Sequence, residues 1–395
     1  PHVKVMRRFQ AWDELPVLPE GRIGIYVGSH THFSEKQNRA IDRFCATYDA
    51  VVICDHTSGY YGKYKLLPTL VQLQSDITPL DLMVHIGEIS AASFNDTIPA
   101  KEVWRVSEDG ELRDPFKKLT TVFQMSEEMF FLHYGKDGCN RHVLIDECRE
   151  LFGEIYEQIP ELPFCNIWTA MQLSSRLPKG ALFHMGVSNT RRCWNMFQLP
   201  ESVESACNVG CCGIDGCVST LVGASLVNPD RLCYVVVGDL TFFYDLNSLG
   251  NHHIGTNLRV MLVNNGRGTE FRLGIHHCNV FGDDADKYMA AAGHFGNKSP
   301  LLVKHYAEDL GFHYLSATTK EEFMTALSNF TNPQLSDHSM ILEVFTDSKD
   351  ESEALYLMSH IQSDAKGMVR SKLKDAVRNV AGEKGINAIK KILKK

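Results

Sequence analysis

Residues 234–268 read YVVVGDLTFFYDLNSLGNHHIGTNLRVMLVNNGRG, and this stretch contains two apolar runs that each end on small polar residues. Asp239 follows the first run, Asn265 follows the second, and a segment long enough for a helix separates them. Strands that alternate with helices are typical of parallel βαβ units. Because a right-handed crossover places the carboxyl ends of such strands close together, we expect Asp239 and Asn265 to lie at one edge of one sheet.

The same alternation extends over most of the chain. A helix is expected at about 35–48, and strands are expected at 21–29, 50–59, 81–88, 101–109, 121–126, 181–186, 205–210, 232–239, 258–265, 312–317 and 340–347. We therefore predict an α/β fold with two doubly wound, mainly parallel-sheet domains. The expected organisation is an N-terminal extension (1–17), a middle α/β domain (18–145), a helical connector (146–178), a second α/β domain (179–362) and a basic helical tail (363–395).

Composition excludes several classes of protein. A net charge of −8 argues against a nucleic-acid partner, which would need a basic face. No run approaches the roughly 20 apolar residues of a membrane span, and residues 1–16 lack the apolar stretch of a signal peptide. The chain begins without Met, as a processed or cloned piece of a longer protein does. Its twelve cysteines form no zinc-ribbon spacing, which favours buried, reduced thiols and a cytoplasmic location.

The two strand ends carry the candidate chemistry. One carboxylate (Asp239), one carboxamide (Asn265) and a backbone carbonyl make an all-oxygen ligand set, which suits Mg²⁺ or Ca²⁺ rather than zinc. Mg²⁺ usually completes its shell with water and phosphate oxygens. The glycines of NNGRG and a helix starting near Thr241 favour an anion beside it. The residues thus indicate a metal-diphosphate site, although an ordinary strand-to-turn junction is also consistent with Gly-Asp and Asn-Gly.

Spacing and neighbouring motifs extend this interpretation to a family. GDL, 23 further residues and then NN resemble the GDG…NN motif of thiamine-diphosphate enzymes. GDLTFFYDLN is similar to the corresponding segment of the 2-succinyl-5-enolpyruvyl-6-hydroxy-3-cyclohexene-1-carboxylate synthases of menaquinone biosynthesis, which also carry Leu in third place. GVSNTRR (186–192), NVGCCGIDGCVST (208–220), MILEVFTD (340–347), CDHTSG (54–59) and DLMVHIGE (81–88) resemble further segments of that family. The resemblance covers about residues 20–360.

The resemblance implies a role for each matching position. Asp239, Asn265 and the Arg267 carbonyl would hold Mg²⁺, and thiamine diphosphate would bind beside them. Ile214 would hold the cofactor in its bent form, and Ser188 and Arg192 would bind acidic substrates. The remaining expected cofactor-binding positions are Gly213, Asp215, Gly238, Leu240, Thr241 and Phe271.

Three segments depart from the family pattern. Val209 replaces an arginine, Glu270 replaces an apolar wall residue, and Cys211-Cys212-Gly213 replaces Ala-Ser-Gly. The cofactor site therefore looks retained and the substrate site changed. The resemblance implies a thiamine-diphosphate- and Mg-dependent decarboxylase/carboligase with 2-oxoglutarate as donor and isochorismate as acceptor. A simple decarboxylase of a different 2-oxoacid and a non-catalytic cofactor-binding paralogue remain alternatives.

Family enzymes also carry a pyrimidine-binding domain of roughly 180 residues, whose Glu protonates the cofactor ring. We expect this activating Glu to lie outside the present sequence, in a longer chain or a complementary subunit. The family further implies a homodimer or homotetramer, a small-molecule 2-oxoacid substrate, and neither a nucleic-acid nor a membrane partner.

Other candidate sites are weaker. The paired histidines His252-His253 and His276-His277 are expected to be loop or surface residues because neighbouring side chains diverge; His276 or His277 as a proton shuttle is the alternative. Asp55-His56 with Ser58 suggests a hydrolase triad, but no GxSxG motif is present. Residues 21–32 lack GxGxxG, so we expect the middle domain to have a structural role.

Overall fold

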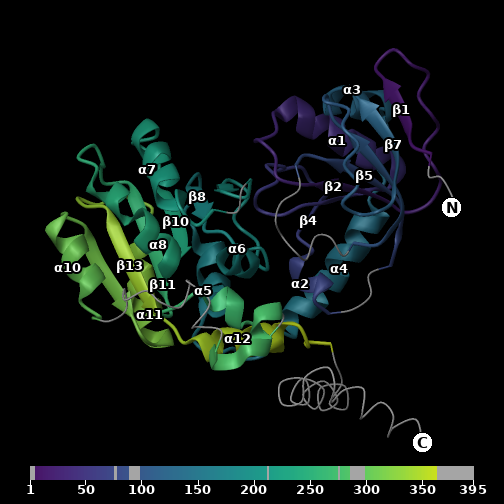
Figure 1. Ribbon diagram of the computed structural model, residues 1–395. Coiled ribbons are helices and arrows are strands. Elements are labelled where there is room, and N and C mark those ends of the chain that lie inside the picture. Colours follow the sequence, from purple (N-terminus) through teal and green to yellow (C-terminus); the bar gives the residue numbers. More distant parts are fainter. Residues whose placement is uncertain are drawn as a thin grey trace, which may run out of the picture.

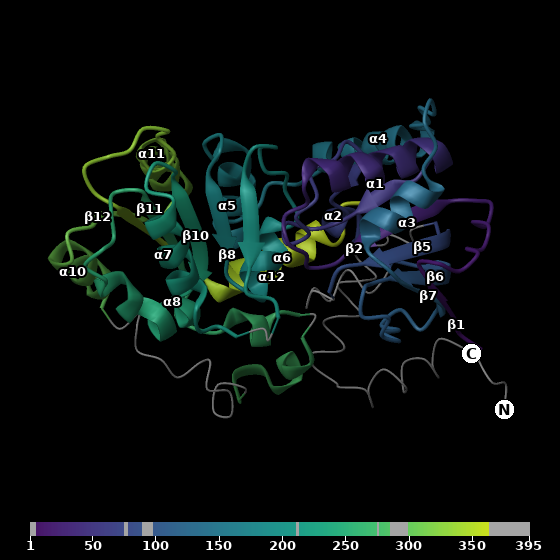
Figure 2. The same ribbon diagram turned by 90° about the horizontal axis from the view of Figure 1, so that it is seen from above.

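The computed structural model describes residues 5–74, 78–88, 98–210, 213–274, 276–284 and 299–362. The expected basic tail (363–395) and the Cys211-Cys212 pair lie outside these residues. The chain forms two α/β units that lie side by side in both views (Figures 1 and 2), and each unit is built on a fully parallel sheet. The predicted fold class is confirmed.

The first unit contains a seven-stranded sheet in the order β1-β7-β6-β5-β2-β3-β4. The strands are β1 (Arg7–Gln10), β2 (Ile23–Val27), β3 (Val51–Ile53), β4 (Lys65–Leu66), β5 (Leu80–Ile86), β6 (Ala100–Val106) and β7 (Leu119–Gln124). The helices are α1 (Glu35–Tyr48) and α3 (Glu127–Tyr134). Helix α2 (Thr69–Gln72) follows β4, but its Leu70 and Val71 pack in the core of the second unit. All five residues of β2 are buried, as in a strand covered on both faces, and this explains its continuous apolar sequence.

Strand β1 lies within the segment that the sequence assigns to an N-terminal extension. It pairs in parallel with β7 at the edge of the sheet, and Phe9 stacks on Phe123 at a centroid distance of 5.6 Å. Its sequence, RRFQ, lacks an apolar run because an edge strand is hydrogen-bonded on one side only and half exposed. The hydrophobic pattern therefore gives little sign of β1.

The strand order of the first sheet reverses between β2 and β5, where α/β sheets usually bind ligands. Here backbone fills that position. Ser29 and Glu88 form an antiparallel bridge just beyond the two strand ends, and a Cβ at Gly28 would lie 1.8 Å from the Glu88 carbonyl oxygen. The reversal point of this sheet is thus closed by the chain itself.

The Asp55–Ser58 segment joins the first unit to the second. Asp55 Oδ1 accepts hydrogen bonds from the backbone N–H and the hydroxyl of Thr57, so the carboxylate holds its own loop. The His56 N–H donates to Asn195 Oδ1 at 2.9 Å, and His56 Nε2 lies 2.9 Å from the Phe197 carbonyl. Burial lowers the pKa of His56 to about 4. These contacts give the Asp-His pair a structural role at the joint between the units.

A helical segment lies between the two units in the chain, and its first helix begins at Val143, three residues before the connector expected at 146–178. It comprises α4 (Val143–Glu157), α5 (Asn166–Leu173) and the 3-10 helix η2 (Ser174–Arg176). Leu144 and Ile145 of α4 pack in the core of the first unit, whereas Ile155 packs in the core of the second. Helix α4 therefore contributes to both hydrophobic cores.

The second unit contains a six-stranded sheet in the order β12-β13-β11-β10-β8-β9. Its strands are β8 (Leu182–Met185), β9 (Glu204–Cys207), β10 (Cys233–Gly238), β11 (Leu258–Asn264), β12 (His313–Ala317) and β13 (Met340–Phe345). Its remaining helices are α6 (Asn189–Trp194), α7 (Cys217–Val227), α8 (Asp239–Asp245), η3 (Leu246–Gly250), η4 (Thr269–Arg272), η5 (His277–Asp284), α10 (Leu302–Asp309), α11 (Lys320–Phe330) and α12 (Ser348–Met358).

Helices cover both faces of this second sheet (Figure 2). Along β10, Tyr234 and Val236 pack with residues of α5, α6, α11 and α12, while Val235 and Val237 pack with residues of α7, α8 and α10. This division follows from the period of two in a strand. The sheet is therefore doubly wound, and its strand order reverses between β8 and β10.

Two further properties concern the described residues as a whole. No helix within them is both long enough and apolar enough to cross a lipid bilayer. The ten cysteines among them are free thiols, and burial raises the pKa of several, including Cys54 to about 12 and Cys217 to about 11. These buried thiols act as small apolar residues.

Candidate functional site

A cavity of about 400 Å³ opens at the carboxyl ends of the second sheet. Its lining comes from Asn166 and from the segments that follow β8, β9, β10 and β11, including the first residues of α6 and α8 and part of η4, with residues from 187–190, Ile214, 238–244 and 263–271. The strand order reverses between β8 and β10, and ligands of doubly wound sheets bind at such a reversal point.

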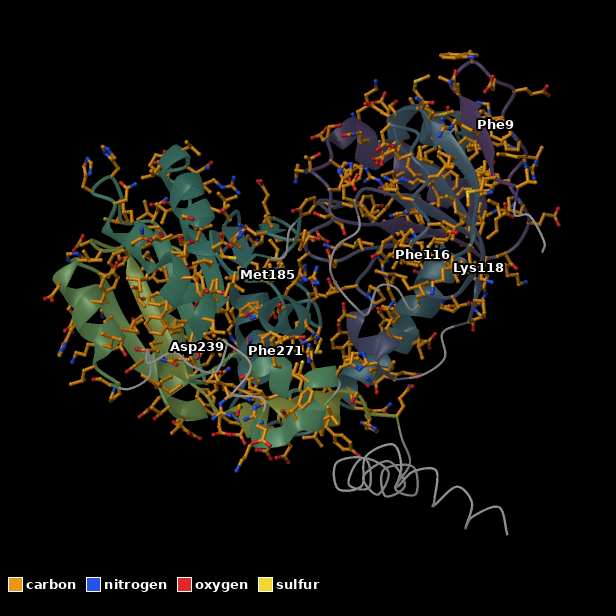
Figure 3. The ribbon with its side chains drawn as sticks, in the orientation of Figure 1. Phe9, Phe116, Lys118, Met185, Asp239 and Phe271 are labelled. Carbon is orange, nitrogen blue, oxygen red and sulfur yellow. The ribbon has the colours of Figure 1, made fainter. Side chains whose placement is uncertain are left out.

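Asp239 and Asn265 reach this cavity because of the strand register. β10 and β11 pair from Cys233↔Leu258 to Gly238↔Val263, so the residues that follow the two strands lie next to each other. Asp239 is 2 % exposed and accepts a hydrogen bond from the Leu240 N–H at 2.8 Å. The sequence predicted this proximity. Both residues line the cavity, and Figure 3 places Asp239 and Phe271 in the same part of the second unit.

The loop after β11 turns back at Gly266, whose φ of +80° lies in the left-handed region that favours glycine. Asn265 Oδ1 accepts from the Arg267 N–H at 3.3 Å across this turn. The turn places the Asn265 carboxamide and the Arg267 residue on the cavity. All three positions predicted to hold a metal thus line one cavity.

The donor set at this cavity fits a hard cation that brings ligands of its own. Within the described ranges, no group of three or more His, Cys, Asp or Glu side chains could hold a metal ion. A cation held by one carboxylate, one carboxamide and one carbonyl keeps further coordination positions for water or phosphate oxygens, as Mg²⁺ does in proteins. Thr269 Oγ1 is buried in the lining without a hydrogen-bond partner among the described residues, so its hydroxyl can donate to a bound anion.

Only some of the expected cofactor-binding residues line the cavity. Gly238, Leu240, Thr241, Ile214 and Phe271 line the cavity. Gly213 and Asp215 flank Ile214 in the chain but are not part of the lining, and Asp215 is exposed.

The expected substrate residues differ in their surroundings. Ser188 lines the cavity with a φ of 60°, a strained backbone for a residue other than glycine. Arg192 lies on α6 and makes a bidentate ion pair with Glu270, with Nη1–Oε2 and Nη2–Oε1 distances of 2.7 and 2.6 Å. Val209 is buried and apolar. The negative charge of Glu270 in the cavity wall is therefore balanced by the positive charge of Arg192.

The buried residues of α12, which lie behind the cavity, were not predicted from the sequence. Glu351 on α12 is 2 % exposed, and its Oε1 accepts from the Asn166 N–H and the Thr346 hydroxyl, both at 3.0 Å. Burial raises the pKa of Glu351 to about 7. Glu351, Ala354, Leu355 and Met358 are the buried residues of α12. Their i, i+3, i+4, i+7 spacing was the sequence signal for an inward-facing Glu.

The His252 and His253 rings do not diverge as the sequence predicted, although both residues are exposed. His252 and His253 contact each other at a centroid distance of 3.8 Å, and His276 contacts Phe271 edge-on at 5.2 Å. Through Phe271, His276 lies next to the cavity, which leaves its predicted role as a proton shuttle untested.

Comparisons with known proteins agree with the motif-based resemblance. No family model matches the chain. In sequence it is similar to proteins named 2-succinyl-5-enolpyruvyl-6-hydroxy-3-cyclohexene-1-carboxylate synthase. The one from Bacteroides fragilis is 33% identical over 293 residues, which are 72% of this chain and 50% of that protein. The one from Phocaeicola vulgatus is 30% identical over 74% of this chain and 51% of its own length. The one from Bacteroides thetaiotaomicron is 32% identical over 71% of this chain and 49% of its own length. The resemblance is confirmed, and the chain spans about half the length of the curated relatives it matches.

Proposed function

We propose that this chain supplies the metal- and diphosphate-binding part of a thiamine-diphosphate- and Mg²⁺-dependent enzyme that acts on 2-oxoacids, of the decarboxylase/carboligase type. One observation carries the proposal. Asp239, Asn265 and Arg267 converge on a single cavity whose lining also contains Ile214 and Phe271. The sequence similarity to the synthases supports the same conclusion.

Each residue has a definite task in this proposal. The Asp239 carboxylate, the Asn265 carboxamide oxygen and the Arg267 carbonyl hold Mg²⁺. The Thr269 hydroxyl would donate a hydrogen bond to the diphosphate, and Ile214 would contact the cofactor from the cavity wall. When bound, thiamine diphosphate supplies an electron sink for the carbanion that remains after a 2-oxoacid loses CO₂.

The active site is completed from elsewhere in this proposal. A Glu from a pyrimidine-binding domain, carried by a longer form of the chain or by a second subunit, would supply the proton for the cofactor ring. The site is accordingly shared in a homodimer, a homotetramer or a complex with a complementary subunit. Free thiols throughout the described residues support a cytoplasmic location.

A second candidate function differs from the first in whether the reaction needs an acceptor. The ion pair between Arg192 and Glu270 favours a second candidate, a simple decarboxylase of another 2-oxoacid, over the carboligase. Product analysis with and without an acceptor separates the two. A carboligase forms a new carbon–carbon bond only with the acceptor, whereas a decarboxylase releases the aldehyde in both cases.

Calorimetric titration of the complete protein, with any further segment or subunit that it carries, tests the cofactor site. We expect thiamine diphosphate to bind only with Mg²⁺, and Asp239→Ala to weaken binding at least about 100-fold. Asp230→Ala is the matched control, because Asp230 is an exposed carboxylate at a turn before β10 and does not line the cavity. Metal-dependent binding that survives in Asp239→Ala contradicts the assignment.

A further inference from the structure

The carboxylate of Glu270 lies between the cavity and the guanidinium of Arg192. Glu270 is part of the cavity lining, whereas Arg192 is not. The Glu270 side chain is 21% exposed and the Arg192 side chain is 8% exposed, so the cation is the more deeply buried partner. A ligand that enters the cavity therefore meets the acidic member of the pair first.

The geometry of the pair occupies the guanidinium. Both terminal nitrogens of Arg192 donate to Glu270, one to each carboxylate oxygen, at 2.7 and 2.6 Å. This is the fork arrangement by which arginine recognises a carboxylate group. Nη1 also contacts Asn189 Oδ1 at 3.4 Å. The chain thus places its own carboxylate where a ligand carboxylate would bind Arg192.

The pair is expected to persist when a ligand arrives. Separating it would leave a charge of either sign in a partly buried position, which is strongly unfavourable. An incoming carboxylate would also face the negative charge of Glu270 across a short distance. An uncharged group meets no such barrier, and the nearby lining offers Val187, Leu240 and Phe271 to an apolar side chain.

We propose that Glu270 sets the substrate class of this cavity by acting as a built-in counter-ion of Arg192, so that the site accepts 2-oxoacids with an uncharged side chain and rejects those with a second carboxylate. This inference rests on the proposed function, because it assumes that a 2-oxoacid binds in the cavity. It assigns to Glu270 a role in specificity.

The test compares two acids of similar length, 2-oxoglutarate and 4-methyl-2-oxopentanoate, by calorimetry on the complete protein without cofactor. We expect the wild type to bind 4-methyl-2-oxopentanoate at least tenfold more tightly. Glu270→Gln keeps the shape of the side chain and removes its charge, so it should shift the preference at least tenfold towards 2-oxoglutarate. Arg192→Met combined with Glu270→Gln removes both charges and should show no such gain.

Several results overturn the proposal. These are equal or tighter binding of 2-oxoglutarate by the wild type, binding of neither acid, and an unchanged preference in folded Glu270→Gln. The wild-type comparison decides the matter if the variants fail to fold. Because these titrations contain no cofactor, a failure here is distinct from a failure of Mg²⁺-dependent thiamine diphosphate binding, which Asp239→Ala reports.

Discussion

Replacing Glu351 with Gln should stabilise the protein at alkaline pH. Glu351 is buried on α12, and its Oε1 accepts from the Asn166 N–H, next to the cavity, and from the Thr346 hydroxyl. Burial raises the pKa of this carboxyl from 4.5 to about 7. The folded protein therefore keeps a proton on Glu351 at pH values where the unfolded chain has released it.

The sign of the effect follows from this difference. The folded state binds more protons, so the contribution of Glu351 to stability is fully present below pH 4.5 and is lost as the pH rises through about 7. At about 1.4 kcal/mol for each pKa unit, the interval between 4.5 and about 7 corresponds to about 3 kcal/mol. Gln retains the oxygen that accepts both hydrogen bonds and cannot ionise, so it avoids this loss.

Urea unfolding followed by circular dichroism between pH 5 and 8.5 measures the effect. We expect Glu351→Gln to exceed the wild type by up to about 3 kcal/mol at pH 8.5, with a small difference at pH 5. Glu353→Gln changes an exposed residue of the same helix and should alter stability by less than about 0.5 kcal/mol. A difference for Glu351→Gln that is independent of pH, or a loss of stability at pH 8.5, contradicts this prediction.

Two further predictions concern the buried framework. Burial lowers the pKa of His56, His85 and His184 to about 4, 3 and 4. The folded state thus binds fewer protons than the unfolded chain at acidic pH. The stabilising contribution of these neutral histidines should be full above pH 6.5 and should fall as the pH drops towards 4. Unfolding free energies that stay constant across this range contradict this expectation. Gly28→Ala places a Cβ 1.8 Å from the Glu88 carbonyl oxygen and should lower the free energy of unfolding by about 3 kcal/mol or more. Gly153→Ala in α4 places a Cβ with no atom within 4 Å and should raise the free energy of unfolding by about 0.5–1 kcal/mol. Thermal unfolding of both variants checks this contrast.

Elements with strong local signals were predictable from the sequence. Helix α1 covers 35–48 as expected, because Ser34 and Gln37 form a capping box at its start. Strands β10 and β11 follow the apolar runs of the 234–268 stretch. The expected strand at 50–59 is shorter, since β3 ends at Ile53 and the Asp55 carboxylate bonds to the Thr57 N–H in a turn.

Features that depend on long-range contacts were not predictable. Arg192 and Glu270 are 78 residues apart, and nothing local in either segment indicates that they pair. Sequence reasoning therefore identified both charges and missed their neutralisation. The positions of Asp239 and Asn265 were predictable because the strand pattern and the crossover rule together determine which strand ends are neighbours.

The most direct test of the central claim locates the metal itself. Crystals of the complete protein, grown with Mn²⁺ in place of Mg²⁺ and with thiamine diphosphate, should show an anomalous peak between Asp239 and Asn265. The distances to both side-chain oxygens should be about 2.0–2.3 Å, and phosphate oxygens should complete the shell. A metal-diphosphate complex bound elsewhere, or no peak there at saturating concentrations of both ligands, contradicts the account.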